Sequence, residues 1–381
     1  MKNLKRVKEI VFYVLIPILL GCQGEKKNVA DTSIVTTNTI KTEELISFEK
    51  ELSDTELFKD FSLIMLETNT ESLFNRISRI CISNKHIFIF DDRLDAILIF
   101  NDSGKFINKI HNLGEGPEEY LSIIDFCLDE TNNELLILCD RPYKLMRFSL
   151  TGQFIDQTPY SELYAEISIV DDHLYCTLQS QRTKYELGEF DLNFLIKNKG
   201  LLSRARINGN CRSLGRNLVK SQNLIYTRFF DSSLYFLYNN KIEKKYEFDF
   251  GKYKGPIEVA YEEDCIKIFE ICRENKYIYS MTNVVESEKY IIFNTNLGIC
   301  LYEKKTNKLT GYRMLKNTTL NSGGEIYYPN QGDGNSIITI FQPSDLQFYD
   351  DESIKKNRIL SDMAKKVKED DNPILVVYHF E

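Results

Sequence analysis

The sequence predicts an all-β protein: a six-bladed β-propeller of four-stranded antiparallel blades, closed by N- and C-terminal strands and carrying one or two short helical insertions. Three observations predict it. One segment repeats at an offset of 48 residues, short apolar strands alternate with turn residues along the chain, and unpaired strand patterns remain at both ends. Four strands per repeat of about 40 to 50 residues are typical of a propeller blade.

The repeat is clearest between residues 86–107 and 134–155, which align without a gap. Both copies contain short apolar strands followed by a polar turn with a glycine, Gly104 in the first copy and Gly152 in the second. A hairpin turn of this kind needs a positive φ, which glycine adopts at little cost. These two copies therefore predict blades 1 and 2.

The remaining blades are predicted from looser copies of the same pattern. Blades 3, 4 and 5 are expected in three stretches: residues 167–197, 224–250 and 279–314. Blade 6 is expected from segments at both ends of the chain: 326–328, 337–341 and 374–380 with an N-terminal strand at 61–67. Pairing the first and last segments in one blade closes the ring and removes open sheet edges.

Two stretches depart from the strand pattern. Residues 257–275 and 352–368 carry apolar side chains at helical spacing, and Pro373 ends the second stretch before the final strand. We expect both helical insertions to cap one mouth or the flank of the ring.

The N-terminus has the pattern of a bacterial export signal. Basic residues precede an apolar run that is too short to span a bilayer comfortably, since a spanning helix needs about 20 apolar residues. The run ends at Cys22 in a Leu-Leu-Gly-Cys sequence that resembles the lipobox of bacterial lipoproteins. We therefore expect a signal peptide at residues 1–21 and a lipid on Cys22, which would attach the chain to a bilayer. An ordinary signal peptide or a short anchor helix is the alternative.

The mature chain divides into a tether and one large domain. Residues 22–44 are mostly polar and are expected to form a flexible tether, while residues 45–381 are expected to form the propeller. Residues 1–21 carry four basic residues and one acidic residue, so their removal changes the formal net charge from −8 to −11. A nucleic-acid partner is not expected, because the acidic chain lacks a basic run for phosphate backbones.

Eight cysteines remain besides Cys22. Most lie inside apolar strand patterns, and no C-x-x-C pair occurs. Buried free thiols are therefore favoured, although an envelope compartment permits disulfides.

A family resemblance rests on the Gly114-Glu-Gly-Pro-Glu-Glu-Tyr120 element, the Gly-x-Phe turns before it and the closing Asp371-Asn-Pro-Ile-Leu-Val-Val-Tyr378 segment. With these residues the chain resembles the six-bladed β-propeller lipoproteins of Bacteroides-like bacteria, which in turn are similar to NHL-repeat propellers. The resemblance implies the fold and a cell-envelope location on the outer membrane, with the periplasmic or surface side undecided. It transfers no catalytic residue.

The candidate ligand-binding residues lie in loops between strands. Arg93 and Arg141 occupy equivalent repeat positions, and Arg182 lies near that position in the third copy. Guanidinium groups gathered at one mouth would bind a carboxylate or sulfate in bidentate fashion, whereas pairing with the neighbouring Asp92 and Asp140 is the structural alternative. Tyr120 and Tyr143 are candidates for stacking on sugars or peptides, although core packing also requires such side chains.

The four histidines are His86, His111, His173 and His379. His86 and His173 both open the second strand of a blade, so we interpret them as repeat positions at hairpin ends. Neither a metal site nor a catalytic base is favoured for this set.

The sequence thus favours a non-enzymatic envelope lipoprotein whose propeller face binds a partner protein, a peptide or a glycan. The alternative is a hydrolase or lyase with a metal or carboxylate site in the central channel. Asp125, on an innermost strand, would then be a candidate ligand and calcium a candidate ion.

Overall fold

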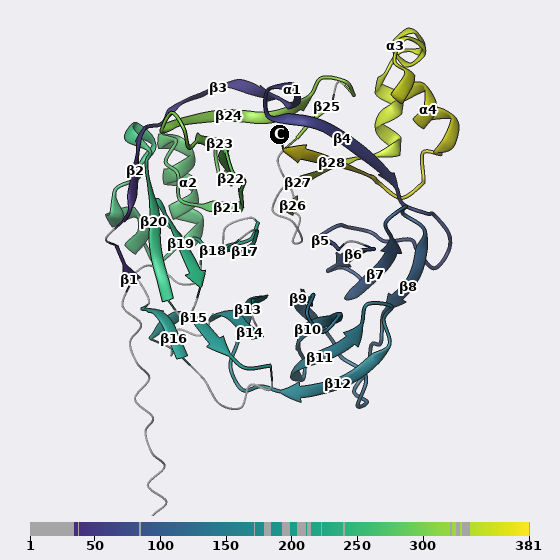
Figure 1. Ribbon diagram of the computed structural model, residues 1–381, viewed down its shortest axis with the longest axis horizontal. Helices are drawn as coiled ribbons and strands as arrows, with labels where there is room; N and C mark the ends of the chain where they lie inside the picture. Colours follow the sequence, from purple (N-terminus) through teal and green to yellow (C-terminus); the bar gives the residue numbers. More distant parts are fainter. Residues whose placement is uncertain are drawn as a thin grey trace, which may run out of the picture.

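The structure is a computed structural model that describes residues 34–380, except 37, 84, 171, 179–183, 193–198, 204–210, 212–214, 222, 239–240, 321, 325–327 and 330–335. Six small antiparallel sheets stand side by side in a ring (Figure 1). Each sheet is one blade, and its first strand lies nearest the centre. The predicted six-bladed β-propeller is therefore confirmed.

Blades 1 and 2 have the regular form that the repeat predicts. Blade 1 contains β5 (Arg79–Ile82), β6 (His86–Asp91), β7 (Ala96–Asn101) and β8 (Phe106–Ile110). Blade 2 contains β9 (Ile123–Asp129), β10 (Glu134–Asp140), β11 (Tyr143–Ser149) and β12 (Phe154–Pro159). Gly104 and Gly152 have φ values of +84° and +85°, as their turns require. A Cβ on Gly104 would lie 2.2 Å from the carbonyl oxygen of Met65, so the turn also packs too closely for a side chain.

Blades 3 and 4 repeat the pattern less regularly. Blade 3 contains β13 (Tyr164–Val170), β14 (His173–Leu178), β15 (Tyr185–Phe190) and β16 (Lys199–Ser203). Its fourth strand was expected at residues 194–197, which lie outside the described residues. Blade 4 contains β17 (Leu218–Lys220), β18 (Leu224–Tyr226), β19 (Ser233–Tyr238) and β20 (Lys241–Asp249).

Blades 5 and 6 complete the ring. Blade 5 contains β21 (Met281–Glu286), β22 (Tyr290–Thr295), β23 (Gly298–Glu303) and β24 (Lys308–Asn317), and the short β25 (Ser322–Gly324) pairs with the end of β24. Blade 6 contains β26 (Tyr328–Pro329), β27 (Ser336–Phe341), β28 (Ile374–Phe380) and β4 (Phe58–Met65). Because β4 pairs antiparallel with β28, the predicted closure of the ring by N- and C-terminal strands is confirmed.

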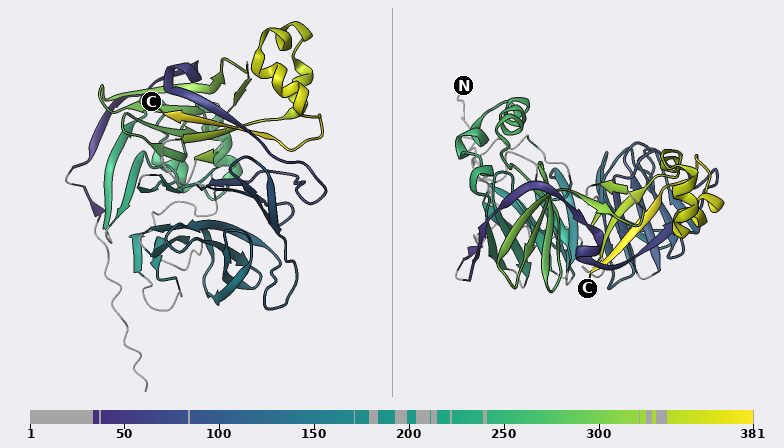
Figure 2. Two further views of the ribbon diagram at one scale, coloured as in Figure 1. Left: turned by 45° about the vertical axis from the view of Figure 1, so that its right-hand side comes forward. Right: turned by 90° about the horizontal axis from the view of Figure 1, so that it is seen from above.

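An N-terminal strap, residues 34–53, runs along the outer edge of two blades before β4. It consists of β1 (Ile34–Val35), β2 (Ile40–Glu44) and β3 (Ile46–Ser53), and α1 (Asp54–Leu57) links it to β4. β1 and β2 pair parallel with β20, and β3 pairs parallel with β24 (Figures 1 and 2). The tether was expected to extend to residue 44, so the structure assigns its last part to the fold. This segment is largely polar, and it pairs at an edge that would otherwise be open.

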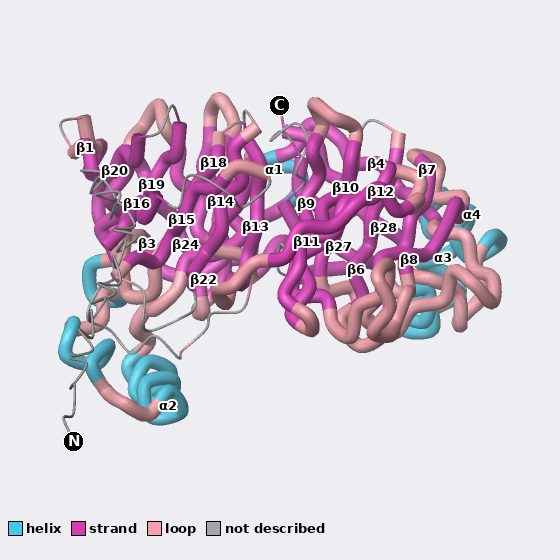
Figure 3. Tube along the Cα trace, turned by 90° about the horizontal axis from the view of Figure 1, so that it is seen from below, coloured by secondary structure: helices cyan, strands magenta, loops and turns pink. Residues whose placement is uncertain are grey.

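The two predicted helical insertions are both present. The first contains η1 (Gly251–Tyr253), η2 (Ile257–Tyr261) and α2 (Cys265–Asn275), and the second contains η3 (Pro343–Phe348), α3 (Asp351–Lys356) and α4 (Arg358–Lys366). Figure 3 shows α2 beyond the lower end of the strands, an end that we call the helix face, and α3 and α4 at the right-hand flank of the ring. The side opposite the helix face carries turns such as β5–β6 and β9–β10 and is called the hairpin face. Among the described residues, no helix is both long and apolar enough to cross a membrane.

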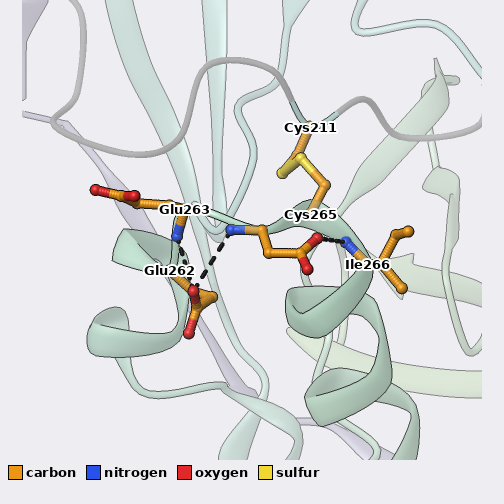
Figure 4. Close-up of a disulfide and its surroundings, with 6 residues drawn as sticks. Cys211, Glu262, Glu263, Cys265 and Ile266 are labelled. Atoms are coloured by element: carbon orange, nitrogen blue, oxygen red, sulfur yellow. Dashed lines mark hydrogen bonds between the residues drawn. A yellow bond between two sulfur atoms is a disulfide. The ribbon is translucent and has the colours of Figure 1, made fainter.

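The cysteines differ in part from the expectation of free thiols. Cys211 and Cys265 form a disulfide, while the other six remain free and buried. Figure 4 shows that the bond fastens the segment after blade 3 to the first residue of α2. Cys211 lies between Asn210 and Arg212, and Cys265 follows three acidic residues, whereas most of the buried thiols lie in apolar strand patterns. That contrast is the signal that separates the two groups.

Candidate functional site

A cavity of about 730 Å³ opens on the hairpin face between blades 6, 1 and 2. Its lining comes from strand ends and turns that these three blades place together. The lining residues are Ser62, Ile64, Ile82, Ser83, Lys85, His86, Asp102, Leu128, Asp129, Glu130, Asn133, Leu150, Ser336, Val377 and His379. We call this the hairpin-face cavity.

The cavity combines apolar and polar walls. Five aliphatic side chains line it, from Ile64 on β4 to Leu150 after β11, and hydroxyl, carboxylate, ammonium and imidazole groups surround them. Part of the acidic lining is already occupied within the protein. Asp129 accepts the backbone N–H groups of Thr131 and Asn132 and thereby shapes its own turn.

Two histidines lie in this cavity although they are far apart in the sequence. His86 opens β6, and its backbone N–H donates to Ser83 Oγ at 3.1 Å. Burial, assisted by the charge of Lys85, lowers the pKa of His86 below its ordinary value. Its Nδ1 is buried without a hydrogen-bond partner in the described part of the chain. His379 lies at the end of β28, with Nε2 3.4 Å from Ser62 Oγ.

A second polar group, the channel cluster, consists of Arg79, Asp125, Glu166 and Arg216. Asp125 on β9 is buried, and its Oδ1 accepts hydrogen bonds from Arg79 and, at 2.8 Å, from Arg216 Nη1. Its Oδ2 accepts the Ile167 N–H at 2.8 Å. Burial alone would raise the pKa of Asp125, but the two guanidinium groups outweigh it and hold the pKa below its usual value.

Glu166 joins the channel cluster to blade 4. Its carboxylate accepts the backbone N–H groups of Asn217 and Leu218 just before and at the start of β17. Burial raises the pKa of Glu166, although Arg216 and these N–H groups act in the opposite direction. The Arg216 N–H also donates to Asn283 Oδ1 on β21 at 3.0 Å. The cluster thus connects the inner strands of five blades across the channel.

The arginines predicted from the repeat lie on the helix-face turns between second and third strands. Arg141 pairs with Asp140, with Nε and Oδ1 2.8 Å apart, and its side chain is 68% exposed. Arg93 is exposed, but Asp92 pairs with Arg76 instead, at 3.4 Å. Arg182 lies outside the described residues. Arg93 and Arg141 therefore occupy equivalent positions, but no contact in the described structure joins them in a shared ligand site.

The two predicted tyrosines have different surroundings. Tyr120 is fully buried, and its hydroxyl donates to the carbonyl oxygens of Asp95 and Ile110, so its ring packs in the core between blades 1 and 2. Tyr143 is 41% exposed and stacks on Tyr160, with ring centroids 5.5 Å apart. Of these two tyrosines, Tyr143 is exposed to solvent and Tyr120 is not.

Asp125 does lie at the channel, where the sequence places it. Both of its oxygens already accept hydrogen bonds, which makes it the centre of an ion-pair group. Among the described residues, no three His, Cys, Asp or Glu side chains gather as a metal-binding group.

Sequence reasoning identified His86 as a hairpin-end residue but missed the cavity around it. Five lining residues, Ser62 and Ser336 among them, come from blade 6, which adjoins blade 1 only after the ring has closed. Arg79 and Arg216 were also missed, because the first begins β5 and the second precedes β17 without distinctive sequence neighbours. The repeat position of His86 was the only signal available before the fold was known.

Comparison with known proteins agrees with this fold. Residues 37–379 match the family described as Domain of unknown function (DUF4934). A structure from Bacteroides fragilis, described as an exported protein, is 19% identical with a TM-score of 0.70 and covers 92% of this chain and 100% of its own. A DUF4221 member from Bacteroides vulgatus is 11% identical with a TM-score of 0.48, covering 85% and 97%. No curated protein matches the sequence.

Proposed function

We propose that this chain, which belongs to the DUF4934 family, is an exported, lipid-anchored binding protein whose hairpin-face cavity takes a small organic ligand or the side chains of a short peptide. The observation that carries the proposal is the cavity itself, which three blades line with apolar side chains and polar groups. Rigid blades with variable turns suit recognition without catalysis.

The size and lining of the cavity support ligand binding. Small-molecule sites in proteins usually enclose about 300 to 1,000 Å³ and combine apolar walls with a few polar groups that fix orientation. The hairpin-face cavity, at about 730 Å³, lies within that range. The imidazoles of His86 and His379 and the hydroxyl of Ser62 are hydrogen-bonding groups beside this apolar surface.

Three observations support export and anchoring. The N-terminal sequence combines a basic start, a short apolar run and Cys22 in a lipobox-like context. The Cys211–Cys265 disulfide fits an oxidising compartment outside the cytosol. The Bacteroides fragilis structure with the same fold is itself described as exported.

A ligand screen with one blocking variant tests the cavity. The mature chain with Cys22→Ser is screened by thermal shift against amino acids, di- and tripeptides, and mono- and disaccharides. Ser62→Trp places a large ring at the exposed edge of the cavity on β4, while Ser161→Trp places the same ring on an exposed serine outside the cavity lining. A cavity ligand should stabilise the parent and the Ser161→Trp protein and leave the Ser62→Trp protein unchanged. Equal stabilisation of both tryptophan variants would move the binding site elsewhere.

The anchor is tested separately in an expressing bacterium. The full chain should incorporate a labelled fatty acid and sediment with membranes, and Cys22→Ser should abolish the label. The matched control is Cys272→Ser, which removes a buried thiol on α2. Label that persists in the Cys22→Ser protein would contradict lipidation at this residue.

A further inference from the structure

We propose that the channel cluster is a second binding site, which takes the carboxylate group of a ligand through the free edge of the Arg79 guanidinium. This inference does not depend on the hairpin-face cavity. β5 begins at Arg79 and ends at Ile82, which lines the cavity. The two sites therefore lie at opposite ends of this strand.

Within the described residues, two of the three guanidinium nitrogens of Arg79 have no hydrogen-bond partner. Nη1 donates to Asp125 Oδ1 and to the carbonyl oxygen of Phe126, and the guanidinium carbon lies 4.6 Å from the centre of the Phe126 ring. The side chain is only 5% exposed. Nε and Nη2 have no hydrogen-bond partner within the described residues. A buried donor without a hydrogen-bond partner lowers the stability of the fold by about 1 to 3 kcal/mol, and by more when the group is charged.

Nε and Nη2 form the edge of a guanidinium that fits a carboxylate. Their two N–H bonds point in the same direction and match the spacing of two carboxylate oxygens. Two other arginines in this chain show the arrangement. Arg228 Nε and Nη2 bond the two oxygens of Glu186 at 2.9 and 3.0 Å, and Arg147 binds Asp156 through the same edge. The Arg79 edge is built like these two but lacks its carboxylate.

The ion pairs of the channel cluster leave Arg79 with a shared carboxylate. Arg79 and Arg216 share the carboxylate of Asp125, whose Oδ1 contacts both. Glu166 uses its oxygens on backbone N–H groups, and its charge acts on Arg216. Within the described residues, Asp125 is the only carboxylate that forms an ion pair with Arg79. A ligand carboxylate would add a second contact to Arg79 in a site where little water competes.

The members of the cluster differ in exposure. The side chain of Arg216 is 16% exposed and Glu166 is only partly buried, whereas Arg79 and Asp125 are 5% and 4% exposed. Because Nε and Nη2 of Arg79 are buried, a carboxylate would reach this edge only after the side chains that cover it have moved. The occupant that fits is a small carboxylic acid or the carboxyl terminus of an extended peptide.

Calorimetric titration of the mature Cys22→Ser protein with acetate tests the proposal, with acetamide as the neutral isostere and chloride added to keep ionic strength constant. We expect saturable binding of acetate and none of acetamide. Arg79→Lys keeps a charge beside Asp125 but lacks the two-donor edge, and it should weaken acetate binding at least tenfold. Arg147→Lys, which removes the same edge from a surface pair, should bind acetate like the parent.

A second measurement remains informative if Arg79→Lys does not fold. In the parent protein labelled at arginine Nε, acetate should shift one buried Nε–H resonance along a saturable curve, while acetamide leaves it in place. Binding that Arg79→Lys retains in full, or a spectrum in which acetate shifts no Nε–H resonance beyond the chloride control, would overturn the proposal.

Discussion

Blades 1 and 2 and blades 4 and 5 use the same four-strand pattern, yet they are completed in different ways. Blades 1 and 2 end at the outer strands β8 and β12, which pair only with β7 and β11 in the described structure. Blades 4 and 5 receive an extra parallel strand each from the N-terminal strap, and the insertion between them carries α2 and the disulfide. Added chain therefore reinforces one side of the ring.

The difference separates stabilising features from candidate binding features. The strap and the disulfide lie on blades 4 and 5, whereas the hairpin-face cavity lies between blades 6, 1 and 2. The channel cluster reaches across and ties the two sides together, because Arg216 precedes blade 4 and Asp125 belongs to blade 2. Substitutions on each side, and in the cluster between them, test whether the two sides contribute differently to stability.

The largest effect is expected where the two sides meet. Asp125→Asn removes the carboxylate that two buried guanidinium groups share, and breaking such a pair costs about 3 to 5 kcal/mol. Glu286→Gln is the control, because its partners Lys304 and Lys245 are 25% and 33% exposed and can turn to water. Urea unfolding should show a clearly smaller loss for Glu286→Gln. Equal losses would mean that the channel cluster does not hold the ring together.

The disulfide should have the next largest effect. It joins residues 54 apart, and loss of a disulfide typically costs about 2 to 4 kcal/mol. Cys265→Ser should therefore lower the free energy of unfolding, and a reducing agent should have the same effect on the parent protein. A Cys211→Ser/Cys265→Ser double variant should not respond to reduction. A response in that variant would show that another thiol pair is involved.

A substitution in the N-terminal strap should lower stability more than one on an open edge strand. Leu52 on β3 is 1% exposed and packs beside Leu315, so Leu52→Ala should cost about 2 to 3 kcal/mol. Ile107 on the open edge strand β8 is 39% exposed, and Ile107→Ala should change stability by less than about 0.5 kcal/mol. Comparable unfolding midpoints for these variants would show that the strap contributes no more than an exposed edge residue.

The smallest effect concerns the pH dependence of the cavity side. The pKa of His86 in the folded protein lies below its ordinary value of 6.5, so the fold favours the neutral ring. The neutral ring of His86 therefore contributes to stability above pH 6.5, and this contribution is lost as pH falls from 6.5 through the lower pKa of the folded protein. His86→Gln should flatten the fall in melting temperature below pH 6.5, whereas substitution of the exposed His111 should not. Identical pH profiles for the parent and His86→Gln proteins would contradict this assignment.

Much of the fold could be predicted because it depends on local pattern. The 48-residue offset between the first two blades and the paired terminal strands lead directly to a closed propeller, and helical spacing locates both insertions. The strap could not be predicted in the same way. Residues 40–44 are largely polar, and they pair with the edge of β20 and with Asn307, which are both distant in the sequence.

The candidate sites were harder to predict because they depend on contacts between distant residues. Asp125 was identified as an inner-strand residue, but its partners Arg79 and Arg216 lie 46 and 91 residues away. Tyr120 had the position of a loop residue, yet closure of the blades buries its ring. The cavity likewise joins Ser62 to Asn133 only when blade 6 closes against blade 1.

We expect the hairpin-face cavity to bind a ligand. A crystal structure of the mature protein with a compound from the thermal-shift screen would show whether the ligand lies there. The compound should lie between blades 6, 1 and 2, with His86, His379 or Ser62 within hydrogen-bonding distance. A compound bound instead on the helix face, with the cavity unchanged, would contradict this expectation.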